Sequence, residues 1–179
     1  MFLVFIKKKK KFKINNQLKK NIISLVSKLK LPNDTFVHRD FHVSNLMMFK
    51  NRYGVIDTQD AVVGNKAYDL ASLIDDVRFK TSKKLKKQVF EYYLNINKAE
   101  LDLKKFKNDF DILSVLRNLK IIGIFTRLAK RDKKYNYLRL IPYTWKLIEL
   151  RINDNFLLKD LKIFLNKNFS KKIRNRNGN

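Results

Sequence analysis

The residues most able to do chemistry lie close together between positions 36 and 76. Asp40 is followed after four residues by Asn45, and Asp57 comes twelve residues later at the end of an apolar segment. A carboxylate such as Asp40 can meet a hydroxyl that attacks a phosphate, and the oxygens of Asn45 and Asp57 suit Mg²⁺. A predicted β-hairpin between Asn45 and Asp57 would bring these two ligands to one end of a small sheet. The pattern predicts a site for phosphoryl transfer.

The same segment resembles a known catalytic loop. His38, Arg39, Asp40 and Asn45 follow the pattern H-R-D-x-x-x-x-N of kinase-like enzymes. With His42, the loop also resembles the H-x-D-x-H-x-x-N of the aminoglycoside phosphotransferase and choline kinase superfamily. Within that group, the stretches similar to the anomeric sugar kinases of cell-wall recycling read VHRDFHVSNLM, GVIDTQDAVVG, AYDLASLIDD and, further on, RNLKIIGIFTRLAKRDKKYNYLRLIP.

This resemblance implies an ATP- and Mg²⁺-dependent kinase that phosphorylates a hydroxyl of an amino sugar, N-acetylmuramate or N-acetylglucosamine. Asp40 would be the catalytic base, and Asn45 and Asp57 would be the metal ligands. Four residues are expected to shape the loop: His38, Arg39, His42 and Asp69. Alternatively, His42 could touch the substrate, Arg39 could pair with a nearby carboxylate or be merely solvated, and Asp69 could be an ordinary helix cap. Four more could line a sugar pocket or simply lie on the surface: Gln59, Asp60, Arg127 and Arg131.

Two features depart from the family pattern. Thr58 stands where the family usually has an aromatic after the metal aspartate, which could loosen the packing around Asp57. The glycines form no cluster that could cover phosphates, and the expected N-terminal lobe with its phosphate-binding lysine is not recognisable. We therefore expect a truncated C-terminal lobe with little turnover alone, to be completed by an N-terminal lobe in the same chain or as a separate polypeptide.

Composition leaves two other readings open. The net charge of +25 would suit a nucleic-acid-binding protein, but the lysines are spread over the whole chain rather than gathered in one stripe. A non-catalytic remnant of a kinase is the second alternative.

The absence of cysteine suits a reducing compartment, and no apolar run approaches the ~20 residues that span a bilayer, so a cytoplasmic protein without membrane contact is expected.

The elements that must position these residues are mostly helical. The predicted fold class is α+β, mostly α: the C-terminal lobe of a kinase-like phosphotransferase with a small β-hairpin that carries the catalytic and metal loops. Residues 1–15 are interpreted as a basic leader, 16–170 as the lobe and 171–179 as a basic tail that frays. Apolar spacing places large aromatics in the core. The expected helices span 16–31, 66–79, 82–95, 102–131, 137–152 and 156–168, with a strand at 35–37 and hairpin strands at 46–50 and 53–56; the expected core aromatics are Phe106, Phe110, Phe125, Tyr143 and Trp145.

Overall fold

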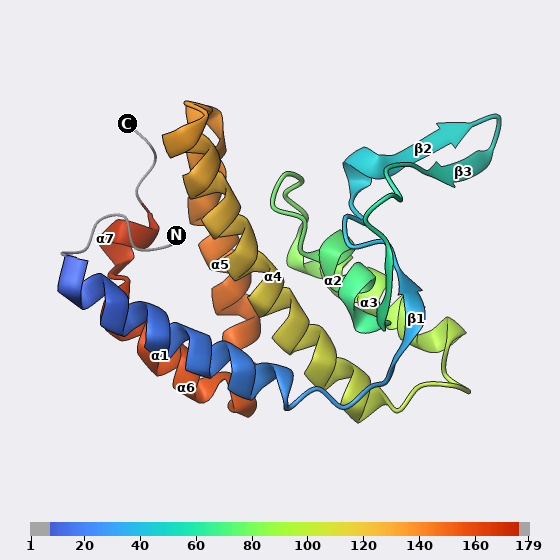
Figure 1. Ribbon diagram of the computed structural model, residues 1–179. Helices are drawn as coiled ribbons and strands as arrows, with labels where there is room; N and C mark the ends of the chain where they lie inside the picture. The colour runs from blue at the N-terminus through green and yellow to red at the C-terminus, as the bar shows by residue number, and fades with distance from the viewer. Residues whose placement is uncertain (1–7, 176–179) are drawn as a thin grey trace. The chain divides into compact units, whose positions relative to one another are not determined.

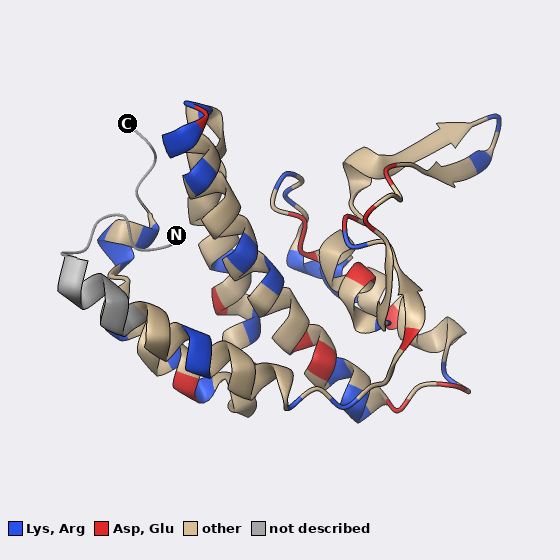
Figure 2. Cartoon of the chain, viewed as in Figure 1, with Lys and Arg blue, Asp and Glu red and all other residues tan. Residues whose placement is uncertain are grey.

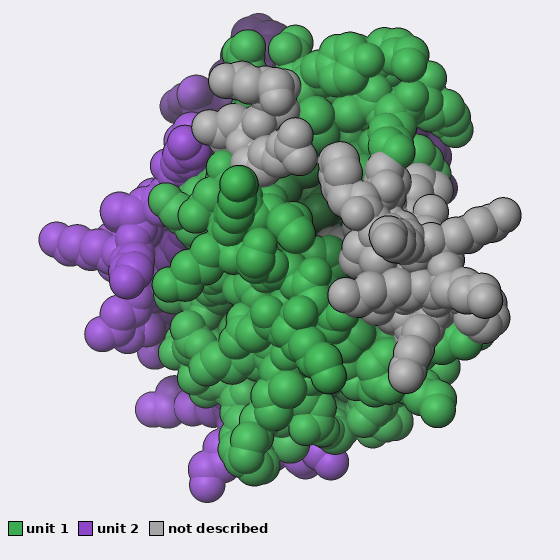
Figure 3. All heavy atoms as spheres, turned by 90° about the vertical axis from the view of Figure 1, so that its left-hand side faces the viewer, with its two compact units in different colours: residues 1–28, 115–179 green, residues 29–114 purple. Residues whose placement is uncertain are grey.

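The computed structural model describes residues 8–175, and side chains from residue 15 onward (Figure 1). The chain divides into two units, coloured separately in Figure 3. Unit 1 contains the described residues 8–28 and 115–175, and unit 2 contains residues 29–114. The division falls inside one long helix, α4 (Leu103–Arg131), so each unit receives one part of that helix.

Unit 2 begins with two small antiparallel sheets. Strand β1 (Asn33–Val37) pairs with β4 (Val62–Asn65), and β2 (Leu46–Phe49) pairs with β3 (Arg52–Val55). The β2–β3 turn consists of Lys50 and Asn51, which have positive φ angles of 45° and 61°. Two consecutive residues with positive φ are typical of the tight turn that matches the twist of a hairpin. The predicted hairpin is therefore confirmed, whereas β4 was not expected from the sequence.

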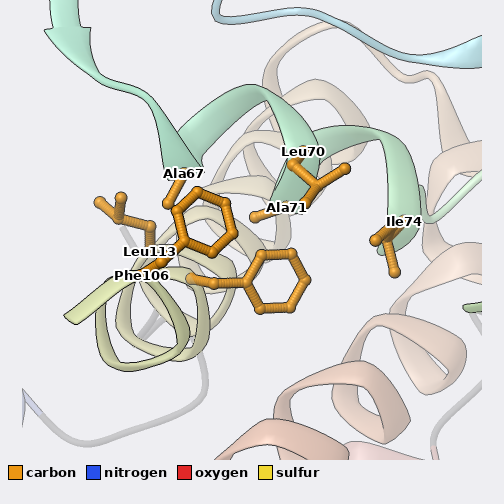
Figure 4. Close-up of a cluster of buried hydrophobic side chains, with 7 residues drawn as sticks. Ala67, Leu70, Ala71, Ile74, Phe106 and Leu113 are labelled. Atoms are coloured by element: carbon orange, nitrogen blue, oxygen red, sulfur yellow. The ribbon is translucent and has the colours of Figure 1, made fainter. Parts of the chain in front are cut away.

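The helices of unit 2 pack on one another through an apolar cluster. Helix α2 (Ala67–Ile74) and helix α3 (Lys83–Ile96) pack against the first part of α4. In Figure 4, side chains from α2 point toward Phe106 and Leu113 of α4. Burying large apolar side chains in this way is worth about 1.5–3 kcal/mol each. The cluster consists of Ala67, Leu70, Ala71, Ile74, Phe106, Phe110 and Leu113.

Helix α2 ends at Ile74, five residues before the predicted end at Phe79. The carbonyl of Ile74 accepts a hydrogen bond from the ammonium of Lys86, which is buried. The same ammonium lies 3.2 Å from Asp75 Oδ1, and Ser114 Oγ donates to Asp75 Oδ2 at 2.6 Å. A buried carboxylate is tolerated only when it is paired and hydrogen-bonded. The helix ends at Ile74, where hydrogen bonds to Lys86 and Ser114 replace those within the helix.

Helix α1 (Lys8–Val26) also differs from its prediction at both ends. Its C-terminus lies before the predicted Leu31, because the N–H groups of Lys30 and Leu31 donate to the buried carboxylate of Asp109 instead of to helical carbonyls. Its N-terminus includes Lys8, so the run interpreted as a basic leader is helical from that residue on. The part of the leader over residues 1–7 lies outside the described residues.

Unit 1 contains the remaining helices. After α4 come a 3₁₀ turn, η2 (Tyr135–Leu140), and α5 (Ile141–Ile152), which together cover the predicted helix 137–152. A second 3₁₀ turn, η3 (Phe156–Leu158), leads into α6 (Lys159–Asn168), and α1 packs beside α6 (Figure 1). Helix α7 (Lys171–Arg174) follows. Of the five aromatics predicted in the cores of the two units, four are buried and Tyr143 is half-buried.

The prediction that the tail frays is wrong for its first residues. Arg174 in α7 is only 7% exposed, and its guanidinium donates to Glu149 Oε1 and Asn166 Oδ1, each at 2.7 Å. It also lies 4.9 Å from the centroid of the Trp145 ring. A guanidinium that stacks on an aromatic face and donates in several directions can be buried without leaving donors unpaired. The basic tail is therefore docked up to this residue.

Figure 2 shows Lys and Arg spread along many helices, in agreement with the distribution along the sequence. Among the described residues, no helix combines the length and the apolar character that crossing a bilayer requires.

Candidate active site

The candidate site is the loop that connects β1 to β2. It begins at His38, directly after the last residue of β1, and ends in a 3₁₀ turn, η1 (Val43–Asn45). His38 is 2% exposed, and its Nε2 lies 2.9 Å from the carbonyl oxygen of Ile56. A carbonyl can only accept, so Nε2 carries the proton in this contact. The start of the loop is thereby joined to the residue that follows β3.

Asn45 closes the loop from its other end. Its Nδ2 donates to the carbonyl of Asp40 at 3.0 Å, while its own carbonyl accepts the N–H of Ile56 at 3.1 Å. Inside the loop, the N–H of His42 donates to Asp40 O at 3.0 Å. These bonds connect Asp40, Asn45 and the residue before Asp57 in one continuous network. The short hairpin between Asn45 and Ile56 makes the network possible, because it brings Ile56 back beside Asn45.

Asp57 follows Ile56 in an unusual backbone conformation. Its φ is 71°, and that of Arg39 in the loop is 72°. Non-glycine residues with positive φ are uncommon and tend to gather at functional sites, where the surrounding structure compensates the strain. The side chains of Asp57 and Asp40 are both exposed. The two carboxylates are thus presented at the surface of unit 2, on a backbone that the network holds.

Asp69 lies in the first turn of α2, outside the loop, and its carboxylate accepts hydrogen bonds from the backbone of the loop. Its Oδ2 accepts the N–H of His38 at 2.7 Å, and its Oδ1 accepts the N–H of Arg39 at 3.0 Å. One carboxylate therefore binds two consecutive backbone donors. Hydrogen bonds to an ionised acceptor are roughly twice as strong as neutral ones. This contact joins the loop to the helix that contributes most residues of the apolar cluster.

The other predicted site residues have different surroundings. His42 is buried, and Arg39 Nη1 donates to the backbone carbonyl of Asp60 at 3.2 Å rather than to a carboxylate. The exposed Gln59 donates from Nε2 to Asp57 Oδ1 at 2.7 Å. The sequence offered Gln59 as a residue that could line a sugar pocket or lie on the surface, and it did not predict this contact. Only its position two residues after the aspartate, in a turn, could have suggested it.

Arg127 and Arg131 belong to unit 1, on the last turns of α4. Arg131 binds Asp132 through two hydrogen bonds, of 2.6 and 3.0 Å. Through these hydrogen bonds, the pKa of Asp132 is lowered and that of Arg131 is raised. Arg127 is half-buried. A sugar-binding role for either arginine stays a prediction.

Asn45 and Asp57 carry oxygens of the kind that Mg²⁺ prefers. The amide nitrogen of Asn45 donates to Asp40, which leaves its Oδ1 as an acceptor, and Gln59 donates to only one of the two oxygens of Asp57. Within the described part of the chain, no cluster of three or more His, Cys, Asp or Glu could hold a metal. Mg²⁺ does not need such a cluster, since it commonly takes one or two protein oxygens and completes its shell with water and phosphate. Asn45 and Asp57 are the pair that could hold it.

Comparison with known proteins identifies the family of the chain. Residues 9–103 match the phosphotransferase enzyme family, and the chain belongs to that family. It is similar to two proteins named N-acetylmuramate/N-acetylglucosamine kinase. That of Caulobacter vibrioides is 34% identical over 137 residues, which is 74% of this chain and 37% of the relative. That of Neisseria meningitidis is 35% identical over 136 residues, or 73% and 41%.

A third relative of the same name, from Pseudomonas aeruginosa, is 34% identical over 122 residues, or 65% of this chain and 36% of the relative. The chain thus spans about two fifths of the length of the curated relatives that it matches. The resemblance seen in the sequence is confirmed at the level of the family.

Proposed function

We propose that this chain provides the catalytic loop of an ATP- and Mg²⁺-dependent phosphotransferase that acts on a hydroxyl of an amino sugar. The observation that supports this most is the network from Asp40 through Asn45 to Ile56, because it connects the candidate base and one candidate metal ligand to the residue that precedes the other, Asp57. The sugar class comes from the names of the relatives, N-acetylmuramate/N-acetylglucosamine kinase.

In this proposal Asp40 accepts the proton of the attacking sugar hydroxyl. Its carboxylate is exposed, while its backbone carbonyl is held by Asn45 and His42, so the side chain can meet a substrate without disturbing the loop. Asn45 and Asp57 bind the metal through Oδ1 and a carboxylate oxygen. When bound, Mg²⁺ neutralises charge on the nucleotide phosphates. His38, Arg39, His42 and Asp69 shape the loop, and Asp60, Arg127 and Arg131 are candidates for sugar binding.

Turnover would require a further lobe that positions the nucleotide, in the same polypeptide or in another. Positioning of reactants can supply ~7–11 kcal/mol of barrier reduction. The β2–β3 hairpin supports this part of the proposal, because its side chains are exposed on both faces: Met48 is 69% exposed, Phe49 71% and Tyr53 82%. A two-stranded hairpin is only marginally stable by itself. A lobe that packs on it would cover this apolar surface.

The proposal is tested by radiometric transfer from γ-labelled ATP to N-acetylmuramate and N-acetylglucosamine, with choline and an aminoglycoside as counter-substrates. The full chain is assayed alone and mixed with the part of the Caulobacter vibrioides relative that lies outside the match. We expect transfer to an amino sugar in the mixture only. Asp40→Asn should lower the rate by about 10²- to 10⁴-fold, the usual contribution of a general base. An unchanged rate would exclude Asp40 as the base, and no transfer under any condition would favour the non-catalytic remnant.

A further inference from the structure

The turn after Asp57 holds that carboxylate through one side chain. Gln59 Nε2 lies 2.7 Å from Asp57 Oδ1, and among the described residues no other side chain bonds to Asp57. Both residues are exposed, so burial does not fix them. We propose that Gln59 is a positioning residue for Asp57, which selects the carboxylate oxygen presented to the metal. This inference rests on the proposed function and assigns Gln59 to the metal instead of to the sugar pocket.

The backbone around Gln59 is itself anchored. The N–H of Ala61 donates to the carbonyl of Thr58 at 3.0 Å, which closes a tight turn over residues 58–61. Arg39 Nη1 donates to the carbonyl of Asp60 inside that turn at 3.2 Å. The N–H of Arg39 is in turn held by Asp69. The position of Gln59 is therefore set by the same framework that holds the catalytic loop.

The chemistry of the pair explains why one hydrogen bond is enough to choose an oxygen. A carboxylate offers two equivalent oxygens, and an amide N–H that donates to one of them makes the other the more available to a cation. Gln59 donates to Oδ1, which favours Oδ2 as the oxygen that meets the metal. Partners that bond the ligands of a metal typically change metal affinity by 10- to 100-fold when they are removed.

The hydrogen bond from Gln59 matters because the residue next to Asp57 cannot pack firmly against it. Thr58 has a small side chain and is exposed. The φ of 71° at Asp57 adds backbone strain that something must offset. The hydrogen bond from Gln59 supplies a local restraint on the side chain, independent of core packing.

The experiment uses the full chain and Mn²⁺ alone as the probe. Paramagnetic broadening of the backbone amide signals of residues 56–59 is followed by NMR during a Mn²⁺ titration. Gln59→Met keeps the size of the side chain but cannot donate, and we expect it to weaken Mn²⁺ binding about tenfold. Gln88→Met is the matched control, because Gln88 is exposed on α3, outside the loop. Asp57→Ala should abolish the broadening.

A second readout separates positioning from a general structural effect. The side-chain amide signal of Gln59 should shift when diamagnetic Mg²⁺ is added, that of Gln88 should not, and Asp57→Ala should remove the shift. Broadening that is lost in Asp57→Ala but unchanged in Gln59→Met would overturn the positioning role and leave the metal site intact. Broadening that is absent from the unmodified chain, or unchanged in Asp57→Ala, would overturn the metal site and the positioning role with it.

Discussion

The carboxylate of Asp69 accepts the backbone N–H of His38 at 2.7 Å, although the two residues are 31 positions apart in the sequence. The neighbouring N–H of Arg39 bonds to the other oxygen of the same carboxylate. An element of the helical core thus fixes the first two residues of the candidate catalytic loop.

Replacement of Asp69 should therefore destabilise the loop and the fold together. Asp69→Ala leaves two backbone donors without their charged acceptor, and hydrogen bonds to charged groups contribute about 1.5–3 kcal/mol each. We expect the free energy of unfolding to fall by about 3 kcal/mol, measured by urea denaturation. Asp154→Ala, at an exposed position, serves as the control and should change it by less than about 0.5 kcal/mol. Equal effects of the two substitutions would show that the Asp69 contact does not stabilise the fold.

The pKa of Tyr93 depends in part on the charge of Asp69. Burial raises the pKa of its phenol above the ordinary value, and the negative charge of Asp69 raises it further. Because the folded-state pKa is the higher one, this group contributes stability below the unfolded pKa of about 10, and the contribution is lost as pH rises through the folded pKa. In a ¹³C-tyrosine NMR titration, Asp69→Asn should lower the midpoint of Tyr93. The midpoint should stay above the ordinary value, because burial is the larger cause; a midpoint that does not move would contradict the electrostatic coupling.

Asp109 joins three segments of unit 2 through one buried carboxylate. It accepts the N–H groups of Lys30 and Leu31 at 2.8–3.0 Å and the amide of Asn65 at 2.7 Å. Asp109→Ala should lower the free energy of unfolding by about 3 kcal/mol, since the buried amide of Asn65 and two backbone N–H groups lose their acceptor and a buried donor left without a partner costs about 1–3 kcal/mol. Hydrogen exchange would locate the effect, with faster exchange expected at Lys30 and Leu31. Unchanged exchange at both amides would argue against this role.

Arg174 should stabilise unit 1. Its guanidinium bonds Glu149, Asn166 and the carbonyl of Phe169, and it stacks on Trp145. Arg174→Lys keeps the charge but loses the planar fork, so we expect a loss of about 2 kcal/mol together with a changed emission of Trp145. Trp145 is the single tryptophan of the chain, so fluorescence reports directly on this contact.

Arg139→Lys is the matched control for Arg174, because Arg139 is exposed in η2. It should leave both the unfolding midpoint and the tryptophan emission unchanged. If Arg174→Lys gives the same result as Arg139→Lys, the docking of α7 contributes nothing to stability.

The sequence by itself determined the elements whose signals are local. Apolar spacing predicted both α3 and α4 to within a residue or two. The hairpin around Asn51 was predictable because the turn residues and the short apolar segments that flank them are adjacent in the sequence. The proposed roles of Asp40, Asn45 and Asp57 also come from the sequence, since they rest on the types and spacing of these residues.

Only the tertiary structure decided the connections between distant residues. Strand β4 exists because β1 pairs with it across the whole hairpin. Asp109 binds the N–H of Leu31, beyond the end of α1, and Lys86 donates to the carbonyl of the last residue of α2. The hydrogen bonds of Arg174 to Glu149 and of Asp69 to the backbone of His38 likewise join residues far apart in the sequence. Periodicity tells which face of a helix is apolar, but a hydrogen bond between residues far apart depends on where both segments are placed in space. That placement results from packing of the whole unit, and no local stretch of sequence contains it.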